Sequence, residues 1–177
     1  MGAPRGGREP VRAGGLRVTA LAAGPGQARA LELGDEGPAV VVLASAPGGA
    51  GAFRPLLEAL SGRFRAVALE LAAPDPERAE ARDAQLVEVA AAALEALEVG
   101  RAAVVGQGAS GRVAVELAVA RPGLVAGLVL AAPAPLARLQ DVHVPVLLYR
   151  RGRIVEHPGL FARALAAFAL RLQPRTA

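Results

Sequence analysis

Short apolar runs recur along the chain and predict buried strands. They occupy residues 38–44, 65–71, 102–105 and 125–132, are rich in Val and Leu, and lack alternation with polar residues. Such runs are typical of parallel strands that are covered on both faces of a sheet. Residues 144–149 form a similar run and predict a final strand.

The segments between these runs have helical patterns. These patterns predict helices over residues 52–60, 76–99, 109–120 and 158–172. The second helix has clear boundaries: Asp75 is its expected N-cap, Pro76 its first residue, and Gly100 follows its end. The pair Arg121-Pro122 ends the third. Strands that alternate with helices predict an α/β fold, a mostly parallel doubly wound sheet with helices on both faces.

The N-terminal part of the chain has a different pattern. Residues 16–23 and 27–33 alternate more strongly and are joined by Gly24-Pro25-Gly26, which predicts an antiparallel hairpin at an edge of the sheet. Residues 1–15 are rich in Arg, Gly and Pro and have no apolar core of a signal peptide, so a flexible tail is expected there. We expect residues 16–177 to form a single domain.

Composition narrows the classes of function. All 20 basic residues are Arg, the formal charge is only +4, and the arginines are dispersed among 16 acidic residues. A mixed-charge surface of this kind predicts no nucleic-acid partner. The chain contains no Cys, which excludes disulfides and thiolate metal sites and favours a cytoplasmic location. The longest uncharged stretch, residues 123–137, is too short and too rich in proline for a membrane span, so no membrane partner is expected.

Four stretches of sequence occur in an order that is similar to one fold family. Residues 38–49 with 53–57 resemble a strand, an oxyanion loop and a first helix, and residues 63–71 resemble the next strand, with Glu70 where an Asp is usual. Residues 105–133 resemble a strand, a sharp turn, a helix and a strand, and residues 156–168 resemble a closing helix. In this order they resemble the α/β-hydrolase fold family, with the cap between residues 132 and 144 nearly absent.

The resemblance implies a nucleophile elbow at residues 106–110, Gly-Gln-Gly-Ala-Ser. The family motif Gly-x-Ser-x-Gly displays its serine at the apex of a strained turn, beside N–H groups that hold an oxyanion. In this chain the apex is Gly108. Glycine tolerates the strained dihedral angles, so the turn is expected to persist without the nucleophile.

Few residues are available to replace the missing catalytic groups. The chain has three serines: Ser45 follows the first buried strand, Ser61 is expected at a helix end, and Ser110 is expected to cap or pack. Of the two histidines, His143 precedes the last strand, at the edge of the sheet opposite the usual ligand crevice, and His157 precedes the closing helix. No catalytic triad is intact; Ser45 and His157 remain as candidates.

Binding is the property that such an elbow retains. The N–H groups of Ala46 and Ala109 are expected to converge near the start of a helix, a position suited to a carbonyl or an anion. We therefore predict a non-hydrolytic chain that binds a small carbonyl or apolar ligand, or a protein partner, with no cofactor. The predicted ligand site consists of Ser45, Ala46, Gln107, Gly108 and Ala109. Two histidines without clustered carboxylates predict no metal site.

Three other interpretations stay open. Residues 106–111 also match Gly-x-Gly-x-x-Gly, the dinucleotide-binding pattern, although the next strand ends without an acidic residue and only Arg138 is available for a 2′-phosphate. A second interpretation is a weak esterase, or an isomerase or cyclase without a triad, that uses Ser45, Gln107 and His157. A third is a decayed or truncated copy with no function.

Overall fold

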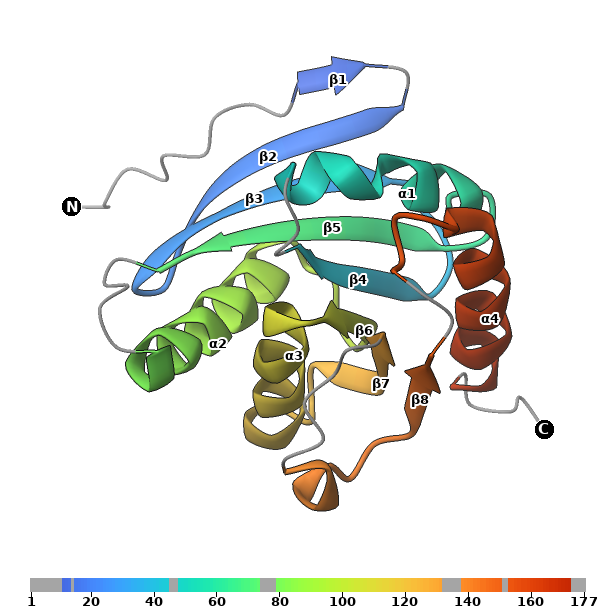
Figure 1. Cartoon of the computed structure of the whole chain (residues 1–177). Helices are drawn as coiled ribbons and strands as arrows, with labels where there is room; N and C mark the ends of the chain where they lie inside the picture. The colour runs from blue at the N-terminus through green and yellow to red at the C-terminus, as the bar shows by residue number, and fades with distance from the viewer. Residues whose placement is uncertain are drawn as a thin grey trace.

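The structure is a computed structural model that describes residues 11–13, 15–44, 48–73, 79–131, 138–150 and 153–172. Its centre is one sheet of eight strands in the order β1-β2-β3-β5-β4-β6-β7-β8 (Figure 1). The strands are β1 Val11–Ala13, β2 Leu16–Ala23, β3 Gly26–Leu33, β4 Ala39–Ala44, β5 Arg65–Ala72, β6 Ala102–Gln107, β7 Val125–Ala131 and β8 Val146–Tyr149.

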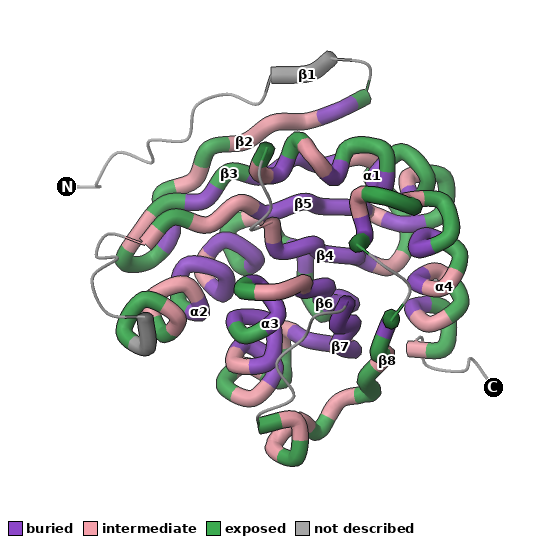
Figure 2. Tube along the Cα trace, viewed as in Figure 1, coloured by how far each residue is buried: buried purple, intermediate pink, exposed green. Residues whose placement is uncertain are grey.

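The sheet has a parallel and an antiparallel part. Strands β5, β4, β6, β7 and β8 pair in parallel, and β3, β2 and β1 continue the sheet antiparallel beyond β5. In β4 and β6 all residues but the last are buried, whereas β2 is mostly half-exposed, a contrast that Figure 2 shows along the trace. The apolar runs of the sequence therefore mark the strands that are covered on both faces.

Helices cover both faces of the sheet and separate two apolar cores. On one face lie α2 (Ala79–Ala96) and α3 (Ala109–Ala120), and on the other lie η1 (Gly49–Phe53), α1 (Arg54–Leu60) and α4 (Pro158–Arg171) (Figure 1). Helix α2 packs on α3, and α1 packs on α4. The predicted fold class, a mostly parallel α/β sheet with an antiparallel N-terminal hairpin, is confirmed.

The boundaries of several elements differ from the predicted ones. The structure divides the first predicted helix into the short 3-10 helix η1 and α1, with Pro55 in the first turn of α1. Strand β6 continues to Gln107 because Gly106 and Gln107 pair with Leu130 and Ala131 of β7. The predicted N-cap Asp75 and the following Pro76 lie outside the described residues.

One expectation about the N-terminus needs correction. Residues 11–13 were expected within a flexible tail, but they form β1, which pairs with residues 16–18 of β2. Three residues are too few for a periodic pattern, so this strand depends on the exposed edge that the hairpin offers. The expected tail also contains residues 1–10, which lie outside the described part of the chain. None of the described helices is both long and apolar enough to span a bilayer.

Candidate functional site

The predicted elbow lies at the carboxyl edge of the parallel strands. Strand β6 ends at Gln107, α3 begins at Ala109, and Gly108 between them has φ 58° and ψ −123°. Residues with a side chain rarely adopt a positive φ of this kind, so the backbone at the apex is strained for anything but glycine. A Cβ added at Gly108 would meet no atom of the described residues within 4 Å. The apex therefore presents bare backbone, with no described side chain against it.

The turn is closed by a very short approach between β6 and α3. A Cβ added at Gly106 would lie 2.7 Å from the Cα of Gly111, 2.7 Å from the carbonyl oxygen of Ser110 and 2.9 Å from the Cβ of Ala114. Only glycine leaves room for the helix to start so near the strand. Gly106 thus fixes the position of the apex relative to α3.

The hydroxyl of Ser110 takes part in this turn. Ser110 is 6% exposed, and its Oγ accepts the N–H of Gln107 at 3.1 Å and donates to the carbonyl oxygen of Gln107 at 3.0 Å. The hydroxyl of Ser61 donates to the carbonyl oxygen of Glu58 at the end of α1. Both described serines therefore hold backbone groups, and neither occupies the apex.

Gln107 links the elbow to the segment that leads into α4. Its Oε1 accepts the N–H of the buried Ile154 at 3.4 Å. Three residues further on, His157 is exposed and forms the N-cap of α4, where its carbonyl oxygen accepts the N–H of Phe161. His143 is exposed and precedes β8, at the opposite edge of the sheet.

The structure brings together only part of the predicted site. Gln107, Gly108 and Ala109 form the elbow, whereas Ser45 and Ala46 lie outside the described residues. Glu70, at the end of β5, accepts the N–H of Ala50 at 3.3 Å and so fixes the start of η1. Within the described ranges, no group of three or more His, Cys, Asp or Glu residues is placed to hold a metal ion.

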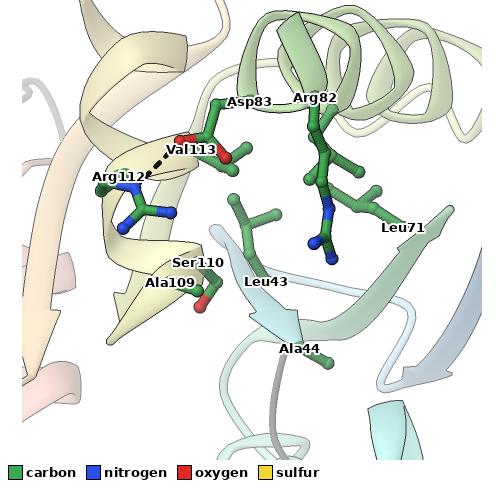
Figure 3. A pocket seen from close by; sticks show the side chains of 10 residues that line it. Leu43, Ala44, Leu71, Arg82, Asp83, Ala109, Ser110, Arg112 and Val113 are labelled. Carbon is green, nitrogen blue, oxygen red and sulfur yellow. Dashed lines mark hydrogen bonds and ion pairs between the residues drawn. The ribbon is translucent and has the colours of Figure 1, made fainter. Parts of the chain in front are cut away.

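A cavity of about 190 Å³ lies beside the elbow, between α2, α3 and the ends of β4 and β5 (Figure 3). Ala109 contributes to its wall. The guanidinium of Arg112 donates to the carboxylate of Asp83 at 2.9 Å across the two helices, and Arg82 also faces the cavity. These charged residues could not be predicted as neighbours from the sequence, because nothing in the spacing of Asp83 and Arg112 indicates that α2 and α3 lie side by side.

Arg138 is engaged in ion pairs. It donates to Asp141 at 3.0 Å and to Glu116 at 2.5 Å. The hydrogen bond with Asp141 and the charge of Glu116 raise the pKa of Arg138 above its ordinary value. A guanidinium that already has two carboxylate partners is a poor candidate for binding a 2′-phosphate.

Tyr149, at the end of β8, has a buried ring and a buried hydroxyl group. Its ring packs edge-on against Phe161, with centroids 4.8 Å apart, and its hydroxyl is buried without a hydrogen-bond partner in the part of the chain that the structure describes. An unsatisfied buried hydroxyl is unfavourable, so Tyr149→Phe should raise the free energy of unfolding by about 1 kcal/mol. Urea denaturation followed by circular dichroism measures the change. A loss of stability would show that the hydroxyl has a partner in solution.

The chain is similar to solved structures, but not to any family model or curated protein. The similar structures include an epoxide hydrolase from Vigna radiata (24% identity, TM-score 0.61), an epoxide hydrolase from an endophytic Streptomyces (25%, 0.59) and a haloalkane dehalogenase from Bradyrhizobium elkani (20%, 0.57).

These matches cover 72%, 67% and 66% of this chain but only 44%, 38% and 41% of the respective enzymes, so the chain spans about two fifths of their length. At this level of identity the likeness concerns the fold. The strand order, the helices on both faces and the strained turn after β6 agree with it. The chain therefore has the α/β-hydrolase fold.

Proposed function

We propose that this chain is a non-hydrolytic protein of the α/β-hydrolase fold that binds a small carbonyl or apolar ligand at its elbow. One observation carries the proposal: the apex, Gly108, has the strained backbone of the turn and no side chain. Hydrolysis by a triad needs a nucleophile at this point together with a base. Binding needs only the shape of the site and its N–H groups.

The surroundings of the apex support binding more than catalysis. Ser110 uses its hydroxyl on the backbone of Gln107, and His157 lies exposed at the start of α4. Removing a triad lowers turnover by about 10⁶-fold in a serine protease and leaves roughly 10³ to 10⁴ over the uncatalysed rate. A chain without these groups keeps at most that residual rate.

Chemical labelling and ester turnover test the proposal. We expect no covalent labelling by a fluorophosphonate probe, and a rate with 4-nitrophenyl acetate that equals the rate of the Ser45→Ala variant. A serine hydrolase run in parallel confirms that the probe and the substrate are competent. Labelling that disappears in Ser45→Ala would reject the proposal and identify the nucleophile.

An active enzyme without a triad is the alternative, because Gln107 and His157 are polar residues on or near the elbow. This alternative predicts a measurable rate that Gln107→Ala or His157→Ala abolishes. Gln107→Ala also removes the bond to Ile154, so its fold must be checked by circular dichroism. No rate with a panel of acyl substrates would reject the alternative.

A dinucleotide-binding protein is a further alternative, based on Gly106 near the end of β6, Gly108 at the turn and Gly111 in the first turn of α3. Titration with NAD and NADP separates it from the proposal, since micromolar affinity for either would favour it. The paired state of Arg138 predicts no preference for NADP. A cytoplasmic location, without nucleic-acid or membrane partners, stays a prediction from composition.

A further inference from the structure

One charged side chain in the wall of the cavity beside the elbow has no partner among the described residues. Arg112 is paired with Asp83 at 2.9 Å, so these two residues contribute no net charge to the wall. Arg82, three residues into the described part of α2, has no hydrogen bond or ion pair within the structure as described. In Figure 3 its side chain runs from α2 toward the end of β4 at Ala44, across the cavity from the Arg112–Asp83 pair. Among the described lining residues, Arg82 therefore leaves a net positive charge on one side of the cavity.

Apart from Ser110, the rest of the wall is apolar. Leu43 and Val113 are buried core residues, and Leu71 and Leu86 are partly buried and pack against the same core. Side chains from two strands and two helices thus form a surface that water hydrates poorly. A ligand that fills the cavity gains from burying an apolar body there and needs an anionic group for Arg82.

The volume limits the size of the ligand. An apolar cavity of about 150 Å³ is large enough to bind benzene. The cavity here measures about 190 Å³, which leaves room for a ring with one small substituent. A carboxylate is the anion whose planar shape matches a guanidinium with two parallel hydrogen bonds. Ala109, the first residue of α3, lies in the same wall, where the positive end of the helix also favours an anion.

We infer that this cavity binds a small carboxylic acid with an apolar body of about the size of benzoate, with the carboxylate on Arg82 and the body against Leu43, Leu71, Leu86 and Val113. The inference rests on the proposed function, since Ala109 of the elbow forms part of the cavity wall. It requires no residue of the missing triad.

Titration of the ¹⁵N-labelled chain with benzoate tests the inference. We expect a dissociation constant on the order of 0.1–1 mM, in the range of a ligand with so few atoms. Shifts should concentrate on the amides of Ala109 and Val113. Arg82→Ala should weaken binding at least 10-fold, and Arg82→Lys should weaken it less, because an ammonium keeps the charge without the planar fork.

A matched control separates a site from general attraction of anions. Arg63 is also an exposed arginine but precedes β5, at the opposite edge of the sheet, so Arg63→Ala should leave the affinity for benzoate unchanged. Equal losses in Arg63→Ala and Arg82→Ala, or shifts spread over the whole surface, would overturn the inference.

Acetophenone separates the carboxylate inference from the proposed function, because it resembles benzoate in size and has a carbonyl group but carries no charge. Binding of acetophenone at Ala109 without binding of benzoate would overturn the carboxylate inference and leave the proposed function standing. Binding of benzoate that is lost in Arg82→Ala supports both. Failure of both compounds to shift any amide would overturn the inference and also count against ligand binding at the elbow.

Discussion

Replacing Gly106 by valine should lower the free energy of unfolding by more than about 3 kcal/mol or prevent folding. Its Cβ would lie 2.7 Å from backbone atoms of Ser110 and Gly111, which have no flexible end that can move aside. Overpacking in a core usually costs about 1–3 kcal/mol, and the two backbone atoms of α3 at 2.7 Å place this substitution at or beyond the upper limit. The N-terminus of α3 would have to move away from β6.

Urea denaturation and amide spectra measure this effect. Gly51→Ala is the matched control, because a Cβ at Gly51 meets no atom within 4 Å and its φ is ordinary. The control should change the stability by less than about 0.5 kcal/mol. If Gly106→Val folded with the stability of the control, the close approach of β6 and α3 would be wrong, and with it the placement of the apex.

Removing the carboxylate of Glu32 is expected to have a comparable effect. Glu32 lies in β3 and is 3% exposed, and its Oε2 accepts two hydrogen bonds from Arg65 of β5, at 2.8 and 3.3 Å. Breaking a buried pair by removing one partner costs about 3–5 kcal/mol, because the remaining charge is left without compensation. Arg65 keeps its hydrogen bonds to the carbonyl oxygens of Leu97 and Glu98, so we expect a loss near the lower limit, about 3 kcal/mol, for Glu32→Ala.

Asp35→Ala is the control for Glu32→Ala. Asp35 also pairs with an arginine, Arg17, at 3.0 Å, but its side chain is 82% exposed. Exposed ion pairs contribute about 0–1 kcal/mol, so this variant should remain close to the parent chain. Equal losses in the two variants would show that the Glu32–Arg65 pair is hydrated in solution.

The Glu32–Arg65 pair also explains how the antiparallel hairpin is held against the rest of the fold. Arg65 joins three elements, because it binds Glu32 on β3 and the carbonyl oxygens of Leu97 and Glu98 at the end of α2. Those carbonyl groups have no partner within the helix and need donors from elsewhere. One guanidinium thus couples β3 of the antiparallel hairpin to the end of the helix that forms a wall of the cavity.

At the elbow, shape and chemistry depend on different residues. Gly106 and Ser110 maintain the turn through close packing and hydrogen bonds, and Gly108 accepts its strained dihedral angles. None of these contacts needs a nucleophile. The same backbone could display a catalytic serine or serve only to bind a ligand. Covalent labelling, ester turnover and titration with benzoate distinguish hydrolysis from binding.

The sequence by itself determined the elements and the class of the fold. Val and Leu runs without polar alternation marked β4, β5, β6 and β7, since strands covered on both faces need apolar residues at every position. The order of glycines after β6 placed the turn and its apex at Gly108. The absence of a serine at the apex is also a property of the sequence alone.

Only the tertiary structure decided which distant residues meet. Three features depend on contacts between distant segments or on an open sheet edge: the extension of β6 to Gln107, the strand β1, and the pair of Arg112 with Asp83. The position of Arg82 in the cavity wall also follows only from the packing of α2. Local patterns in the sequence indicate whether a position is buried, because burial selects apolar side chains. They do not indicate which distant residue that position contacts. The charge of the cavity depends on which of its arginines is paired with an acidic residue. That pairing follows only from the contact between α2 and α3.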